Sequence, residues 1–205
     1  MEAVSTRLIE WGVAELALGG QVENGDCSVV QPFAGGVLLA AVDGLGHGHE
    51  AAAAARIAAA TLGQFASEPL AALFYRCHEG LRHTRGVVMS LASFHAGEPT
   101  MAWCGVGSVA GVLQRVGPFG SPASDTLLLR SGVVGSHLPP LRASTYAVNP
   151  GDTLILATDG IRPGFAEELL RLVPPQPAAD RILSRYARGT DDALVLVARY
   201  RGGTA

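Results

Sequence analysis

Several classes of protein are excluded by what this sequence has little of. Charged residues make up only 16% of the chain, the net charge is -3 and lysine is absent, so the clustered basic face of a nucleic-acid-binding protein is not expected. No uncharged run reaches the roughly 20 apolar residues that span a bilayer, although the mean hydropathy is +0.28. The N-terminal segment lacks the basic and apolar regions of a signal peptide. We therefore predict a cytoplasmic protein whose partners include neither nucleic acid nor a membrane.

Cysteine is also scarce. Cys27, Cys77 and Cys104 are odd in number and lack CxxC spacing, and each lies in an apolar stretch. They are predicted to be reduced core residues, and not members of a disulfide framework or a zinc site.

The chain is long enough to fold around its own core. It has 205 residues, of which 48% are hydrophobic, and no repeat, low-complexity linker or charge run divides it. This length and composition predict one globular domain over residues 1–205. Because such a domain buries most of its apolar surface unaided, any metal would serve chemistry and would not be needed for stability.

Alternating and continuous apolar runs predict a fold rich in β-strands. The runs 27–33 and 37–42 flank Ala-Gly-Gly, which predicts a hairpin. The expected strands cover residues 8–18, 27–33, 37–42, 86–94, 99–106, 109–116, 126–129, 145–148, 152–158 and 193–200.

Helices are predicted between these strands. The alanine-rich stretch 48–66 predicts a buried helix that lies close to a sheet, and Ser67 as N-cap with Pro69 in the first turn opens a second helix. Two more are expected near residues 165–173 and 177–188. Runs of strands followed by helices favour a mostly antiparallel α+β architecture over a doubly wound parallel sheet.

Four aspartates fall at the ends of strand-like apolar runs. Asp26 begins one strand of the predicted hairpin and Asp43 ends its partner, so antiparallel pairing makes the two side chains neighbours. Asp159 ends a later strand and Asp191 begins the last one. If those two strands also pair antiparallel, one sheet edge collects all four carboxylates.

Carboxylates gathered at the rim of a core repel one another unless cations neutralise them. Oxygen ligands without cysteine or paired histidine favour magnesium or manganese over zinc. The alternative is that each aspartate is only a turn or cap residue, since Asp-Gly is a common turn dipeptide.

Three segments in order resemble the PPM family of metal-dependent serine/threonine phosphatases. VDGLGHGHEAAAAA, NPGDTLILATDGI and TDDALVLV are similar to successive signatures of its bacterial branch, which contains SpoIIE, RsbU and RsbX. The resemblance covers about residues 24–200 and is strongest to the short stressosome phosphatases of that branch. It implies a four-layer α/β/β/α sandwich of two mostly antiparallel sheets flanked by helices, with two Mn²⁺ or Mg²⁺ ions in the cleft.

The resemblance also implies roles for residues of this chain. Asp43 would bridge the two metals, Gly44 would offer its backbone carbonyl to one, and Asp159 and Asp191 would complete the ligands of the other.

Two further acidic residues have supporting roles under the same resemblance. Asp26 would act through metal-bound water, and Asp192 would orient the neighbouring ligand from outside the metal's direct contacts. The implied reaction is direct attack of a metal-activated hydroxide on phosphoserine or phosphothreonine, without a phosphoenzyme.

The sequence departs from eukaryotic members of the family at three places. Leu45 replaces the histidine that follows Asp-Gly, so the general acid is unassigned and His47 and His49 are the nearest candidates. The alternatives are that His47 is a capping or solvated turn residue and that metal-bound water supplies the proton. The phosphate-binding arginine before the first acidic motif is missing, and Arg162 is a candidate substitute, with an exposed loop arginine as the alternative. Gly107 occupies the place of the aspartate that binds a third metal, which predicts two metals.

Three functions remain open. The first is a protein phosphatase that resets phosphorylated STAS-domain proteins of a bacterial stressosome. The second is the same chemistry on an anti-sigma-factor antagonist, as in SpoIIE or RsbU. The third is a non-catalytic, metal-binding docking module, which three converging carboxylates make less favoured.

Overall fold

Two five-stranded antiparallel sheets form the centre of the protein in this computed structural model, which describes residues 8–116, 124–167 and 173–202. Sheet A has the order β1-β10-β9-β6-β7 and sheet B the order β2-β3-β4-β5-β8. The strands of sheet A are β1 (Ile9–Leu16), β10 (Ala193–Tyr200), β9 (Thr153–Ala157), β6 (Ala110–Gln114) and β7 (Ser124–Thr126). Those of sheet B are β2 (Asp26–Phe33), β3 (Gly36–Gly44), β4 (Val87–His95), β5 (Thr100–Val106) and β8 (Ser144–Ala147).

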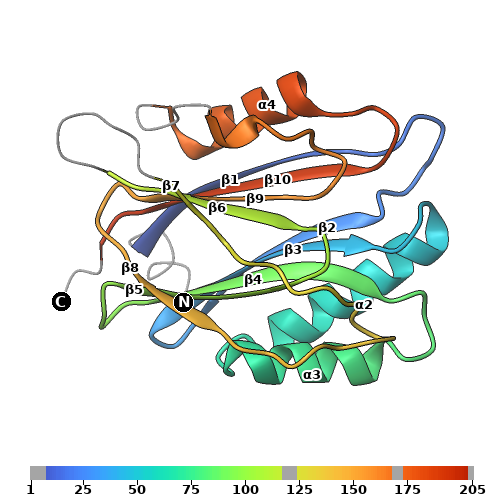
Figure 1. Cartoon of the computed structure of the whole chain (residues 1–205), viewed down its shortest axis with the longest axis horizontal. Helices are drawn as coiled ribbons and strands as arrows, with labels where there is room; N and C mark the ends of the chain where they lie inside the picture. The colour runs from blue at the N-terminus through green and yellow to red at the C-terminus, as the bar shows by residue number, and fades with distance from the viewer. Residues whose placement is uncertain (1–7, 117–123, 168–172, 203–205) are drawn as a thin grey trace.

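Helices cover the outer face of each sheet. Helix α4 (Pro175–Tyr186) lies on sheet A, where it contacts β1 and β10, and helices α2 (His49–Gln64) and α3 (Leu70–Gly80) lie on sheet B (Figure 1). The four layers are therefore helix, sheet, sheet and helix. This confirms the predicted α+β sandwich.

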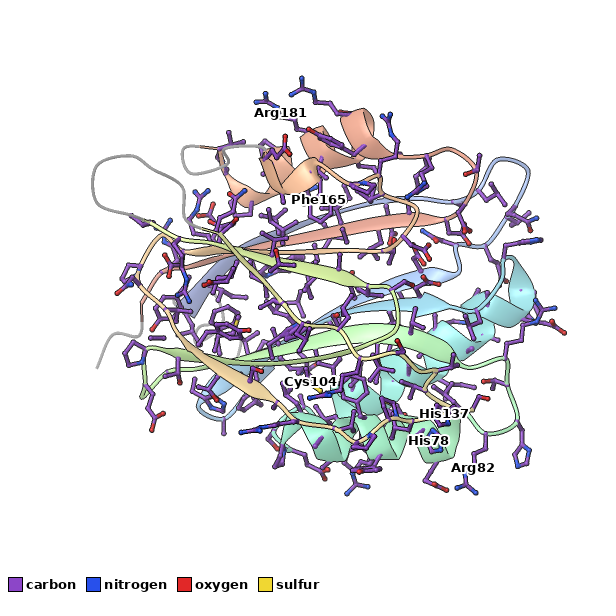
Figure 2. The ribbon with its side chains drawn as sticks, viewed as in Figure 1. His78, Arg82, Cys104, His137, Phe165 and Arg181 are labelled. Atoms are coloured by element: carbon purple, nitrogen blue, oxygen red, sulfur yellow. The ribbon has the colours of Figure 1, made fainter. Side chains whose placement is uncertain are left out.

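The alternation of side chains along β3 explains how one strand serves two cores. Val37, Leu39 and Ala41 face sheet A, whereas Leu38 and Ala40 face the helices, and all five are fully buried. Figure 2 shows side chains filling the layers on both sides of sheet B. Because β3 is buried on both faces, its sequence is continuously apolar up to the last two residues.

Small residues allow α2 to lie against sheet B. A Cβ on Gly44 would come within 2.2 Å of the Ala51 carbonyl oxygen, so the end of β3 and the first turn of α2 are in direct backbone contact. The alanines on the inner face of the helix, such as Ala54 and Ala58, are fully buried. The predicted alanine-rich helix and its close packing are thus confirmed.

Several predicted element ends were wrong. Helix α3 begins at Leu70 after Pro69, with no side-chain cap from Ser67, because the extended conformation of Pro69 delays the helix. The strand predicted over 126–129 is instead Ser124–Thr126, which pairs with β6. Where a helix over 165–173 was predicted, the described residues Phe165–Glu167 form a 3₁₀ turn, and residues 168–172 lie outside the described residues.

The helix predicted over 177–188 starts two residues earlier, at Pro175, because two prolines fit its first turn. Cys77 and Cys104 are buried, as predicted, but Cys27 on the edge strand β2 is only partly buried. Among the helices of the described residues, none has the length and apolar character needed to cross a membrane.

Candidate metal centre

The predicted hairpin places Asp26 directly opposite Asp43. The register of β2 and β3 pairs these two residues at the open end of the hairpin. By the alternation along β3, Asp43 has the same parity as Ala41, whose side chain faces sheet A. The two side chains therefore lie on the inner face of sheet B, at the end of β3 from which the chain continues into α2.

The ends of β9 and β10 contribute the remaining carboxylates from sheet A. These strands pair antiparallel, so Asp159, just after β9, and Asp191, just before β10, meet at the same end. The two loops are closely packed, since a Cβ on Gly160 would lie 1.9 Å from the carbonyl oxygen of Asp192. The prediction that one sheet edge collects all four carboxylates was therefore wrong, because the hairpin of Asp26 and Asp43 belongs to sheet B and the strands next to Asp159 and Asp191 belong to sheet A.

Burial and mutual repulsion raise the pKa values of the two carboxyls on sheet B. The pKa of Asp26 rises to about 7, first through burial, and it is raised further by the charges of Asp192, Asp159 and Asp191. That of Asp43 rises to about 8, first through burial and then through the charge of Asp26 and the three aspartates of sheet A. The negative charges of the sheet A aspartates therefore reach both carboxyls of sheet B.

Hydrogen bonds cross between the sheets within this group, and one of them joins two side chains. The hydroxyl of Thr158, at the end of β9, donates to Oδ2 of Asp26 at 2.7 Å. Sequence reasoning missed Thr158, because its partner Asp26 is 132 residues away in the sequence and no local pattern marks the pair.

Asp192 holds a loop in place. Its Oδ1 accepts from the backbone N–H of Leu18 at 2.7 Å, and its Oδ2 accepts from that of Gly25 at 2.8 Å. The carbonyl of Gly25 in turn accepts from the N–H of Gly44. Asp192 thus links the start of β10 to the chain around the Asp26–Asp43 pair.

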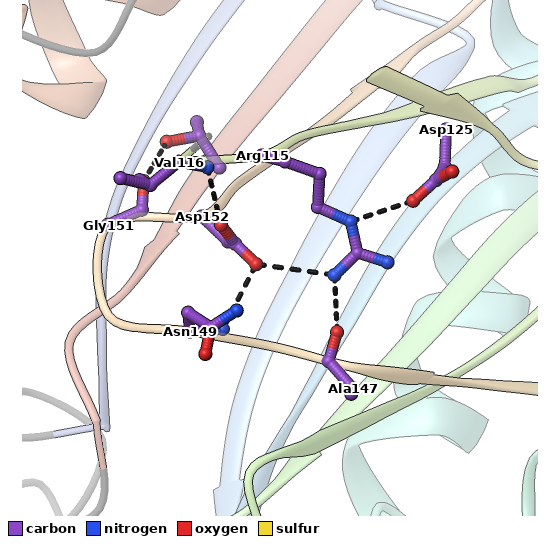
Figure 3. A network of polar contacts seen from close by, with 8 residues as sticks. Arg115, Val116, Asp125, Ala147, Asn149, Gly151 and Asp152 are labelled. Carbon is purple, nitrogen blue, oxygen red and sulfur yellow. Dashed lines mark hydrogen bonds and ion pairs between the residues drawn. The ribbon is translucent and has the colours of Figure 1, made fainter. Parts of the chain in front are cut away.

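A buried carboxylate at the opposite end of β9 offers a contrast. Asp152 is 1% exposed. Its carboxylate accepts a hydrogen bond from the guanidinium of Arg115 at 3.3 Å and further bonds from the backbone N–H groups of Val116 and Asn149 (Figure 3). Arg115 also pairs with Asp125 at 2.7 Å and donates to the Ala147 carbonyl. The positive charge of Arg115 thus neutralises Asp152, whereas the charges that act on Asp43 are those of neighbouring aspartates and are negative.

This contrast supports a cation at the aspartate group. Oxygen donors of high charge density are the ligands that Mg²⁺ and Mn²⁺ prefer. Within the described ranges, however, no three His, Cys, Asp or Glu side chains already lie close enough to enclose a metal ion.

The remaining predicted residues lie around this edge. His47 is exposed in the turn between β3 and α2, and its role as general acid stays a prediction. The side chain of Arg162 donates to the Arg185 carbonyl at 2.6 Å, while Nε of Arg188 donates to the Asp159 carbonyl at 2.8 Å. Gly107 has φ +94°, and a Cβ there would lie 2.1 Å from a methyl carbon of Val88.

Comparison with known proteins places this fold and site in a family. The family of Stage II sporulation protein E (SpoIIE) matches residues 34–201. This range includes all the strands and helices described here except β1 and β2. The chain therefore belongs to the SpoIIE family, and its fold is that of the PPM phosphatases.

Individual relatives place it closer to one branch of these phosphatases. Phosphoserine phosphatase RsbX of Bacillus subtilis (strain 168) is 24% identical over 127 residues, which are 61% of this chain and 61% of the relative. A solved structure described as the bacterial stressosome, a modular system adapted to control secondary messenger signaling, is 30% identical with a TM-score of 0.85. It covers 93% of this chain and 99% of its own.

Two further solved structures contain metal. RsbX in complex with magnesium has a TM-score of 0.83 at 22% identity and covers 94% of this chain and 96% of its own. The catalytic domain of the serine/threonine protein phosphatase PstP with two manganese ions has a TM-score of 0.70 at 19% identity, covering 95% and 99%. At these identities the likeness shows the shared fold.

Proposed function

We propose that this chain is a Mn²⁺- or Mg²⁺-dependent protein phosphatase that hydrolyses phosphoserine and phosphothreonine. The observation that carries the proposal is the convergence of aspartates from both sheets at one edge, in a chain of the SpoIIE family. The raised pKa values of Asp26 and Asp43 indicate a site that a divalent cation would relieve of repulsion.

In the proposed site, Asp43 and the carbonyl of Gly44 would hold one cation, and Asp43 would also contribute to a second cation together with Asp159 and Asp191. When bound, two such cations lower the pKa of a coordinated water and stabilise the incoming and leaving oxygens of an in-line displacement.

The residues of this chain position and polarise the attacking water and the phosphate group, and none of them is proposed as a nucleophile. Water adds to phosphorus and the serine or threonine oxygen leaves, so one P–O bond forms and one breaks without a phosphoenzyme. Asp26 orients the water, and Asp192 keeps the adjoining loop in place through Leu18 and Gly25. His47 is the proposed proton donor to the leaving oxygen.

The substrates we propose are phosphorylated STAS-domain proteins of a bacterial stressosome. The proposal is supported by the similarity to the phosphoserine phosphatase RsbX and to the structure described as the bacterial stressosome. We also propose a cytoplasmic location, in keeping with such partners.

A second candidate is the dephosphorylation of an anti-sigma-factor antagonist. It is supported by a structure of the RsbU and RsbW domains of Rv1364c from Mycobacterium tuberculosis, with 19% identity and a TM-score of 0.81. The two candidates share their chemistry and differ in partner.

The test is hydrolysis of p-nitrophenyl phosphate and of a phosphoserine-containing STAS protein, with Mn²⁺, Mg²⁺ or EDTA. We expect turnover that requires the cation and falls by at least about 100-fold in Asp43→Asn. Glu98→Gln, which neutralises a carboxylate in the β4–β5 turn, is the matched control and keeps wild-type activity. Folded protein that binds the cation but hydrolyses neither substrate would favour the docking module.

A further inference from the structure

A chain of hydrogen bonds runs from the backbone of sheet A to a carboxylate of sheet B. The N–H of Leu194 in β10 donates to Oγ1 of Thr158 at 2.8 Å. The hydroxyl of Thr158 then donates to Oδ2 of Asp26 at 2.7 Å. Thr158 is 2% exposed and Asp26 6%, so both bonds are shielded from water.

The donor and acceptor roles in these two hydrogen bonds follow from the number of protons and lone pairs on the Thr158 hydroxyl. A hydroxyl has one proton to donate, and the Leu194 N–H already occupies one of the lone pairs of Thr158. The other acceptor near this hydroxyl, the Leu194 carbonyl, is farther away at 3.4 Å. The Thr158 proton therefore points at Asp26, and the pairing favours the ionised carboxylate.

The consequence concerns the orientation of Asp26. Its Oδ2 accepts a hydrogen bond from a residue of the opposite sheet, which restrains the rotation of the carboxylate. Thr158 also immediately precedes Asp159, one of the aspartates of sheet A. A single buried side chain thus connects the carboxylates that the two sheets contribute.

From this arrangement we propose that Thr158 is a positioning residue, which fixes the carboxylate of Asp26 and the spacing between the two halves of the cation site. The inference rests on the proposed cation site. In this proposal Thr158 acts through Asp26 and does not need to contact a substrate or a cation.

The test measures Mn²⁺ affinity of the EDTA-treated protein by calorimetry, independently of activity. Thr158→Val keeps the shape of the side chain but removes the hydroxyl, and we expect it to weaken Mn²⁺ binding by about 10- to 100-fold. Thr158→Ser retains the hydroxyl and is expected to stay within about threefold of wild type. If the valine variant does not fold, Thr158→Ala carries the same prediction.

Thr153 provides the matched control. It is the first residue of β9, the strand that ends just before Thr158, and it is 1% exposed. Its hydroxyl donates to the Gly151 carbonyl at the far end from the aspartates. Thr153→Val therefore also removes a buried threonine hydroxyl, but Mn²⁺ affinity should stay at the wild-type value. Equal losses in Thr153→Val and Thr158→Val would overturn the proposal, because they would trace the effect to general destabilisation.

A double-mutant cycle isolates the pathway through Asp26. In an Asp26→Asn background, Thr158→Val should produce a much smaller further loss of Mn²⁺ affinity. Full additivity of the two losses, or wild-type affinity in folded Thr158→Val, would contradict a role through Asp26. Since these measurements need only cation binding, they remain decisive if the protein proves not to hydrolyse phosphoserine.

Discussion

Asp26 and Asp43 show at the scale of single residues how burial changes the protonation of a carboxyl. They are paired across β2 and β3, and burial is the largest cause of the rise in both pKa values. A carboxyl buried without a cationic partner favours its protonated form. The pair is therefore expected to release protons when a divalent cation binds.

The raised pKa values predict how stability depends on pH. A carboxyl whose pKa is higher in the folded protein binds more protons when folded, so the free energy of unfolding falls as pH rises between the unfolded and folded values. For Asp43 this window extends from the ordinary 3.8 to about 8. The metal-free protein should thus lose stability over this range.

Asp43→Asn should remove part of this dependence. In EDTA at pH 8 we expect the variant to be more stable than wild type by about 1–2 kcal/mol, or roughly 2–8 °C in Tm. At pH 4, where the wild-type carboxyl is protonated, the difference should nearly vanish. Thermal denaturation at both pH values checks this, and equal Tm values at pH 8 would contradict it.

Gly107 carries a second prediction at this scale. A side chain there would meet Val88 and would require an unfavourable positive φ. Gly107→Asp should therefore cost about 2 kcal/mol or more and should add no further cation site. A variant with wild-type Tm and one more Mn²⁺ per chain, counted by native mass spectrometry, would contradict this.

The sequence predicts the aspartate positions well because strand ends are easy to recognise. Asp-Gly after a continuous apolar run marks the end of a buried strand, and hairpin pairing then brings Asp26 beside Asp43. Thr158 could not be assigned in this way. Its role depends on the distance between two sheets, which no local pattern records.

Among the elements, α2 shows the closest connection to the site. Its first turn packs directly against the backbone of Gly44, so there is no room for a side chain between the end of β3 and the start of the helix. Gly44→Ala should push α2 away, cost about 2–4 kcal/mol through overpacking and weaken Mn²⁺ binding.

Gly63 near the end of the same helix is the matched control. A Cβ there would meet only ordinary contact, with Oε1 of Gln31 at 3.8 Å. Gly63→Ala should stabilise the protein by about 0.5–1 kcal/mol, since alanine favours a helix. Chemical denaturation of both variants checks the pair, and a stable Gly44→Ala protein would contradict the packing argument.

Element ends illustrate where sequence reasoning reaches its limit. Helix α3 was predicted from its apolar spacing, but its start depends on Pro69 and not on the Ser67 cap. Residues 165–173 have helical spacing, yet the described part from Phe165 to Glu167 is one 3₁₀ turn. Helical spacing records an apolar face, whereas the ends of an element depend on backbone conformation and neighbouring packing.

At the scale of the whole molecule, the site depends on two sheets that are far apart in the sequence. Asp26 and Asp43 come from the first quarter of the chain, whereas Asp159 and Asp191 come from the last. The composition and strand pattern predict an α+β architecture, but the four-layer arrangement was implied by family resemblance. Only the folded chain shows that Thr158 and Asp192 tie the two sheets together at this edge.

The central claim is that carboxylates from both sheets form one site for two divalent cations. The most direct test counts bound Mn²⁺ by calorimetry and native mass spectrometry in wild type, Asp43→Asn and the Glu98→Gln control. We predict two Mn²⁺ per chain in wild type and in the control, and a loss of both tight sites in Asp43→Asn, because that carboxylate is shared. No binding to wild type, or unchanged binding to folded Asp43→Asn, would contradict the account.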